Sequence, residues 1–100
     1  MKVQYPHSHS KEEVYEIFNS YFDSVRERKM RHGEITEAEC TWNSTQDIVD
    51  ITVYAMGNSR SGQVIIEDKQ VIVKGKLPII AIPFRNQIKQ QIIKKLEDLL

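Results

Sequence analysis

Apolar side chains recur every three or four residues between residues 11 and 32, which is the period of one face of an α-helix. Ser10 and Glu13 have the spacing of a capping box, in which side chains satisfy free backbone donors at a helix start. Gly33 can adopt the left-handed conformation that often ends a helix. The pattern therefore predicts a helix over residues 11–32. Its core-facing stripe consists of Val14, Ile17, Phe18, Tyr21, Phe22 and Val25.

From Glu34 the period changes to two, which is typical of half-buried antiparallel strands. The alternation predicts a four-stranded meander over residues 34–77, with strands at about 34–42, 47–56, 62–67 and 70–77. Residues 57–62 have turn chemistry and are predicted to form a mobile hairpin loop. Lys2–Tyr5 is predicted to be a short first strand, bounded by Pro6. The expected inward residues of the first two meander strands are Thr36, Ala38, Cys40, Trp42, Val49, Ile51, Val53 and Ala55.

The C-terminal quarter carries more apolar surface than a small sheet can cover. Pro83 suits the first turn of a helix, which is predicted over residues 83–100. Its apolar positions span an arc of about 180°, whereas a helix resting on a sheet needs little over 100°. The apolar connector 78–82 adds to this surplus, and such surfaces mark contacts with other molecules. The predicted interaction surface comprises Ile79, Ile80, Ile82, Phe84, Arg85, Lys89 and Ile93.

These elements define an α+β fold in the order β-α-β-β-β-β-α, an antiparallel sheet with two helices packed on one face. One hundred residues predict a single domain over 1–100. A domain of this size buries little core, so self-association as a homodimer would help to stabilise it.

Charge is balanced overall but unevenly distributed. Lys and Arg number 14 and so do Asp and Glu; residues 1–50 hold 6 basic and 10 acidic residues (net −4), and residues 51–100 hold 8 and 4 (net +4). Between Lys69 and Lys95 there are seven basic residues and no acid. The two halves either neutralise each other, are simply solvated, or attract an anionic surface or polymer.

Location is predicted to be cytoplasmic, because there is one cysteine and no basic-then-apolar leader. The longest apolar run, residues 77–84, is far below the roughly 20 residues that cross a bilayer, so no membrane span is expected.

No residue constellation predicts catalysis, a cofactor or a bound metal, and we expect the protein not to be an enzyme. His7 and His9 form half of a metal site at most, with His32 or Cys40 as distant third ligands, and are predicted to flank the helix start. Cys40 is expected to be a buried, inert thiol. Trp42 and Tyr54 are too sparse among cations to predict a nucleic-acid surface.

Several segments of the second half of the chain carry a family resemblance. The segment His7-Ser8-His9-Ser10, which leads into the first predicted helix, supports it. The segments of the second half are Ser61-Gly62-Gln63-Val64-Ile65-Ile66-Glu67-Asp68, Val71-Ile72-Val73, Gly75-Lys76-Leu77-Pro78 and Pro83-Phe84. With the amphipathic last helix, the chain resembles the polyhydroxyalkanoic acid system proteins, small bacterial proteins linked by name to polyester storage granules.

The resemblance implies a non-enzymatic accessory protein of polyhydroxyalkanoate metabolism, with a granule surface or a granule protein as its partner. A granule coat protein needs exposed apolar surface bordered by charge, which the C-terminal surface would supply. One alternative is a carrier of a small hydrophobic ligand, held between the sheet and the last helix where Gly75 makes room, in a cavity of a few hundred Å³. The other is a nucleic-acid-binding or regulatory domain.

Overall fold

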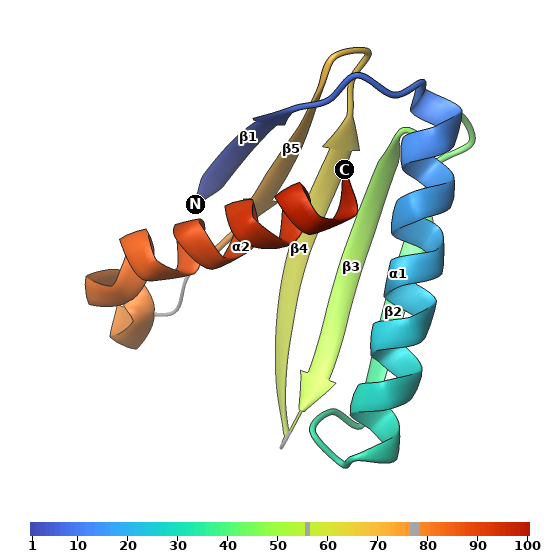
Figure 1. The fold of residues 1–100 in the computed structure, drawn as a ribbon. Helices are drawn as coiled ribbons and strands as arrows, with labels where there is room; N and C mark the ends of the chain where they lie inside the picture. The colour runs from blue at the N-terminus through green and yellow to red at the C-terminus, as the bar shows by residue number, and fades with distance from the viewer. Residues whose placement is uncertain (56, 77–78) are drawn as a thin grey trace.

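The computed structural model describes residues 1–55, 57–76 and 79–100, and of Ile79 and Ile80 it describes the backbone alone. Five strands form one antiparallel sheet in the order β1-β5-β4-β3-β2 (Figure 1). The elements in chain order are β1 (Lys2–Pro6), α1 (Lys11–Arg31), β2 (Glu37–Trp42), β3 (Ile48–Ala55), β4 (Asn58–Ile66), β5 (Gln70–Gly75), the 3₁₀ helix η1 (Ile79–Phe84) and α2 (Arg85–Leu99). The predicted α+β fold is confirmed.

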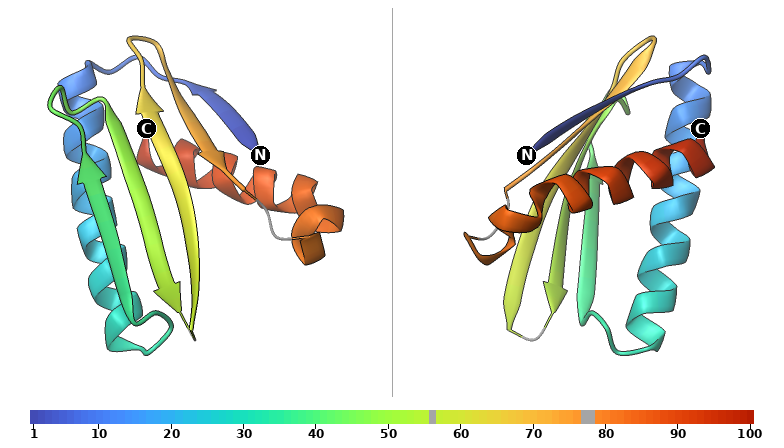
Figure 2. Two further views of the ribbon diagram at one scale, coloured as in Figure 1. Left: turned by 180° about the vertical axis from the view of Figure 1, so that it is seen from behind. Right: turned by 60° about the vertical axis from the view of Figure 1, so that its left-hand side comes forward.

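Both helices cover the same face of the sheet, as predicted (Figure 2). Helix α1 lies along β2, while α2 crosses the opposite part of the sheet over β1 (Figure 1). The core lies between these helices and a row of directly opposed residues that runs across all five strands: Val3, Val73, Val64, Val49 and Trp42. Val14 and Phe18 of α1 and Leu96 of α2 pack onto this core.

The ends of α1 follow from local chemistry. Ser10 is the N-cap, and its Oγ accepts the backbone N–H of Glu13 at 3.2 Å, as the capping box predicts. The helix ends at Arg31, and Gly33 has a φ of 73°, which a glycine adopts without strain. The backbone N–H of Glu34 donates to Lys29 O at 2.9 Å and so satisfies a carbonyl left free at the helix end.

Three predicted element boundaries are wrong. The first strand of the meander, β2, begins at Glu37 rather than at residue 34. The expected loop over residues 57–62 is mostly strand, because β4 begins at Asn58 and pairs with β3 from its first residue. The last helix begins at Arg85 rather than residue 83, and Pro83 lies in the preceding 3₁₀ helix. Small polar residues predicted turn chemistry at 57–62, where strand pairing extends β4 instead. Pro83 was predicted to lie in the first turn of the last helix, but it lies in the tighter 3₁₀ helix before it. Met56, Leu77 and Pro78 lie outside the described residues.

The helix-free face of the sheet is also partly apolar. Ile48 lies directly opposite Ile65, which lies opposite Ile72. Ile72 is only 8% exposed although no helix covers this face. Branched neighbours on adjacent strands therefore shield one another, which is how cross-strand pairs stabilise a sheet.

Candidate interaction surfaces

The most exposed large apolar side chains of the described residues lie close together in the chain, just before the C-terminal helix. Ile82 is 51% exposed and Phe84 is 55% exposed, whereas Tyr54 and Met30 reach only 38% and 36%. Both residues belong to η1, which projects beyond the sheet edge (Figures 1 and 2). We call Ile82 and Phe84 the apolar tip. The tip lies at the N-terminal end of α2, and Leu96 near the other end of this helix is buried in the core.

The structure divides the interaction surface predicted from the sequence. Ile82, Phe84, Arg85 and Lys89 are exposed and lie within η1 and the first turns of α2. Ile93 is half-buried and packs against the core. The side chains of Ile79 and Ile80 lie outside the described part of the chain.

The apolar surplus of α2 is largely absorbed by its own fold. Leu96 is buried, and four half-buried residues pack against the core cluster: Ile92, Ile93, Leu99 and Leu100. The core therefore covers the apolar arc of about 180° in the C-terminal part of α2. Uncovered apolar surface remains at the other end, on η1.

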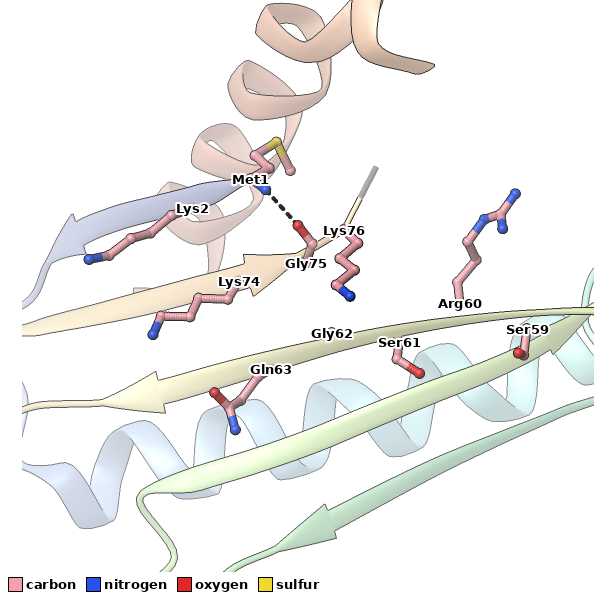
Figure 3. Close-up of a pocket in the computed structure, with 10 residues that line it drawn as sticks. All are labelled: Met1, Lys2, Ser59, Arg60, Ser61, Gly62, Gln63, Lys74, Gly75 and Lys76. Carbon is pink, nitrogen blue, oxygen red and sulfur yellow. Dashed lines mark hydrogen bonds between the residues drawn. The ribbon is translucent and has the colours of Figure 1, made fainter. Parts of the chain in front are cut away.

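A large hollow lies beside the tip, where strand β5 separates from β4 (Figure 3). β5 pairs with β4 only as far as Gly75 opposite Gly62, while β4 continues to Asn58 along β3. The two opposed glycines leave bare backbone at this point. A Cβ added to Gly62 would lie 3.2 Å from the Lys74 carbonyl oxygen, so the strands approach closely there. The hollow has a volume of about 790 Å³.

The charged residues that line this hollow are all cations, and we call it the basic hollow. They are Lys2 from β1, Arg60 from β4, Lys74 from β5, and Lys76, which follows β5 (Figure 3). Ser59, Ser61 and Gln63 add polar groups. The run of basic residues and the gap at Gly75 are visible in the sequence. Lys2 and Arg60 join them only through the strand register, which no sequence pattern specified.

Two smaller hollows lie between the basic hollow and the start of α2, and one of them reaches Ile82 of the tip. One, of about 360 Å³, is lined by Met1, Lys76, Ile82 and Arg85. The other, of about 280 Å³, is lined by Met1, Lys2, Arg85, Asn86 and Lys89. Shared lining residues make the three hollows one continuous surface. Six cationic side chains line this surface, Lys2, Arg60, Lys74, Lys76, Arg85 and Lys89, and two of them, Lys76 and Arg85, share a hollow with Ile82 of the tip.

An apolar groove opens on the other side of the molecule, between α1 and strands β2 and β3. Its volume is about 330 Å³. The lining consists of Phe22, Val25, Arg26, Lys29, Glu34, Ile35, Ala38, Cys40, Ile51 and Val53. Two ion pairs border it, Arg26 with Glu37 at 2.6 Å and Lys29 with Glu34 at 2.9 Å. The sequence-based hypothesis of a ligand cavity placed it beneath α2 instead.

Cys40 lines this groove and is exposed, so the prediction that it is buried is wrong. Alternation correctly placed Cys40 on the inward face of β2, opposite Ile51. Because β2 is the sheet edge and α1 does not cover this position, the side chain stays accessible. Partial desolvation by the groove, with a smaller effect of Asp23, raises the pKa of the Cys40 thiol above its ordinary value. It is therefore protonated and poorly nucleophilic at neutral pH.

The N-terminal histidines are engaged with the backbone. The His7 Nε2 lies 2.8 Å from Glu67 O, and the His9 Nε2 lies 3.0 Å from Leu100 O. The hydrogen bond to Leu100 and a second one to Glu13 raise the pKa of His9 above its ordinary value. Among the described residues no three side chains of metal-ligating type come together.

Two carboxylates on strands β2 and β3, Glu37 and Asp50, accept hydrogen bonds. Glu37 accepts the backbone N–H of Ala38 at 2.8 Å, and its pKa is lowered first by this bond and then by Arg26. Asp50 accepts a hydrogen bond from Gln63 Nε2 at 3.0 Å. A carboxyl with a lowered pKa is held ionised, so Glu37 is not a proton donor at neutral pH.

Fold and surface together define a small α+β protein in which the apolar tip and the cations around it are the outstanding exposed features. A family model described as "Putative polyhydroxyalkanoic acid system protein" matches residues 1–100, the whole chain. The chain therefore belongs to the family of polyhydroxyalkanoic acid system proteins, as the sequence motifs indicated. No curated protein and no solved structure matches it. None of the helices in the described ranges combines the length and apolarity that a bilayer crossing requires.

Proposed function

We propose that this protein is a non-enzymatic accessory protein of polyhydroxyalkanoate metabolism that binds the surface of polyester granules through its apolar tip. The observation that carries the proposal is the exposure of Ile82 and Phe84 on a projecting segment. A polyester granule is an apolar body with an amphiphilic coat, so apolar side chains bordered by charge suit its surface. Membership of the polyhydroxyalkanoic acid system family supports the same context.

The expected contribution of the tip follows from its exposed area. Complete burial of an Ile or Phe side chain contributes about 1.5–3 kcal/mol, and each tip residue still exposes about half of its surface. Burying both on a granule would therefore contribute roughly 1.5–3 kcal/mol. Since 1.4 kcal/mol corresponds to a factor of ten, the tip should change granule binding by about ten- to a hundredfold.

The decisive experiment is sedimentation of the protein with purified granules. The double variant Ile82→Ser/Phe84→Ser should lose at least tenfold in granule affinity. The matched control Met30→Ser/Tyr54→Ser removes the two other exposed large apolar residues among those described, which lie outside the tip, and it should bind like the wild type. Circular dichroism should show both variants folded, because all four side chains are substantially exposed. Equal retention of the wild type and the tip variant would refute the proposal.

A second copy of the chain is the competing occupant of the tip. A small domain gains stability from self-association, and exposed apolar residues also suit a dimer interface. Light scattering distinguishes the two uses of the tip. A dimer that becomes monomeric in the Ile82→Ser/Phe84→Ser variant, without granule binding by the wild type, would assign the tip to self-association.

The apolar groove beside α1 favours a second candidate function, transport of a small hydrophobic ligand. Its volume of about 330 Å³ lies at the lower end of the range typical of ligand sites. A fluorescent fatty acid is a direct probe. Cys40→Phe would fill the groove and should abolish binding of the probe, whereas Thr41→Phe, on the opposite face of the same strand, should not. No binding by the wild type would eliminate this function.

A further inference from the structure

The six cations that line the three hollows differ in their electrostatic partners from four of the other basic residues. Within the described residues Arg28, Lys69, Lys94 and Lys95, like the six, form no ion pair. In the acidic half of the chain, Lys11, Arg26, Lys29 and Arg31 each form an ion pair with a carboxylate. None of the cations bordering the three hollows forms one within the described residues. In the part of the chain that the structure describes, no carboxylate lines these hollows, and Asp50 is linked to their margin only by its hydrogen bond with Gln63. Among the described residues, no ion pair therefore joins a cation of the basic half to a carboxylate of the acidic half.

The strand register brings like charges together at this place. Lys2 of β1 lies directly opposite Lys74 of β5. Like charges in directly opposed positions destabilise a sheet, so the pairing costs stability in the isolated protein. An anion placed beside both ammonium groups would turn this repulsion into attraction. The hollow beside them provides room for anionic groups, and its bare glycine backbone allows a close approach.

The neighbouring apolar tip indicates which class of anion the basic hollow binds. A small free anion or a nucleic acid would pair with the cationic side chains but would leave Ile82 and Phe84 exposed to water. A layer of anionic amphiphiles presents negative headgroups and an apolar interior together, which matches exposed apolar residues bordered by Lys and Arg. The hollows connect the cations to the tip continuously through Lys76 and Arg85.

We propose that the basic hollow binds phosphate headgroups of anionic phospholipids, so that the protein docks on an anionic lipid layer with its apolar tip inserted. This inference rests on the proposed function of the tip and adds the chemistry of the surface to which the tip binds. It assigns to Lys2, Arg60, Lys74 and Lys76 a role in recognising that surface.

Vesicle flotation tests the proposal with defined lipids. The full chain should float with vesicles of phosphatidylcholine mixed with phosphatidylglycerol, and at least tenfold less with phosphatidylcholine alone. Binding should weaken as salt is raised, because headgroup attraction is screened. Equal flotation with both kinds of vesicle would overturn the proposal.

Two variants that remove the same amount of charge distinguish the contribution of the basic hollow to binding from the effect of net charge. Lys74→Gln/Lys76→Gln should lower binding to the anionic vesicles at least tenfold. Arg28→Gln/Lys69→Gln removes the same charge at exposed positions outside the three hollows and should change it less than twofold. An equal loss in both variants would show that only net charge matters and would overturn the assignment to the hollow.

Three further results separate this inference from the proposed function and from binding of nucleic acid. If the wild type binds granules through the tip but shows no preference for phosphatidylglycerol, the hollow has no lipid role and the proposed function stands. If the tip variant keeps full granule binding, the proposed function fails whatever the vesicles show. A single-stranded oligonucleotide that binds more tightly than the vesicles, with no effect of Ile82→Ser/Phe84→Ser, would overturn the lipid assignment in favour of nucleic acid.

Discussion

Leu96 is the residue through which α2, and with it the apolar tip, is tied to the core. It is 3% exposed and is the only fully buried side chain among the described residues of α2. Replacing a buried leucine with alanine costs about 2–5 kcal/mol through lost transfer energy and the cavity left behind. Because the η1 end of α2 projects from the fold, the helix has some freedom to settle into the cavity. We therefore expect a loss of about 2–4 kcal/mol for Leu96→Ala.

This loss is large compared with the stability of a domain of this size, which is about 5–15 kcal/mol. A loss of 1 kcal/mol lowers the Tm of a domain of 60–100 residues by about 4–8 °C, so Leu96→Ala should lower it by roughly 10–25 °C. Urea unfolding is followed by far-UV circular dichroism and by the fluorescence of Trp42, the one tryptophan of the sequence. The Trp42 ring packs against Tyr15 in an edge-to-face arrangement, with the two ring centroids 4.7 Å apart. Lys94→Ala, at an exposed position of the same helix, is the control and should change stability by less than about 0.5 kcal/mol. A loss below about 1 kcal/mol for Leu96→Ala would refute the packing argument.

Three further predictions concern the ends of α1 and the contact between the chain's two ends. Ser10→Ala removes the N-cap acceptor and should cost about 1 kcal/mol in urea unfolding, whereas an unchanged midpoint would show that the cap does not contribute. Gly33→Ala forces a side chain into a φ of 73° and should cost about 1–2 kcal/mol; an equally stable variant would contradict that conformation. The pKa of His9 is raised by its hydrogen bonds to Leu100 and Glu13, so its stabilising effect should be complete below the unfolded pKa and should disappear as pH rises through the folded pKa. The stability difference between the wild type and His9→Gln should therefore shrink from pH 5 to pH 8, and a constant difference would rule the contact out.

Elements with a strong local signal were predicted well from the sequence. The apolar stripe and the Ser10 cap specified α1 to within one residue. Alternation specified β3 to within one residue at each end, and it specified the end of β2 but placed its start three residues too early. Prediction failed where local chemistry was ambiguous. Residues 58–61 contain small polar side chains that suit a turn, yet they extend β4 because β3 offers a partner along its full length.

The candidate surface was predicted in outline. The sequence indicated an apolar excess near the C-terminus, and Ile82 and Phe84 are the most exposed large apolar residues of the described chain. It could not show that the rest of α2 is covered by the core, because coverage depends on where the helix crosses the sheet. It also placed Cys40 in the interior, since alternation gives the face of a strand but not whether a helix covers that face.

The sequence by itself determined which segments form helices and strands, the α+β class and the family, because these depend on short-range periodicity, capping and motifs. Only the tertiary structure decided which residues meet. The register set Lys2 opposite Lys74, the early end of β5 opened the basic hollow beside Arg60, and the docking of α2 through Leu96 left the tip in solvent. The physical reason is that pairing between distant strands and the crossing of a helix over a sheet arise from the packing of the whole chain. No local stretch of residues encodes them.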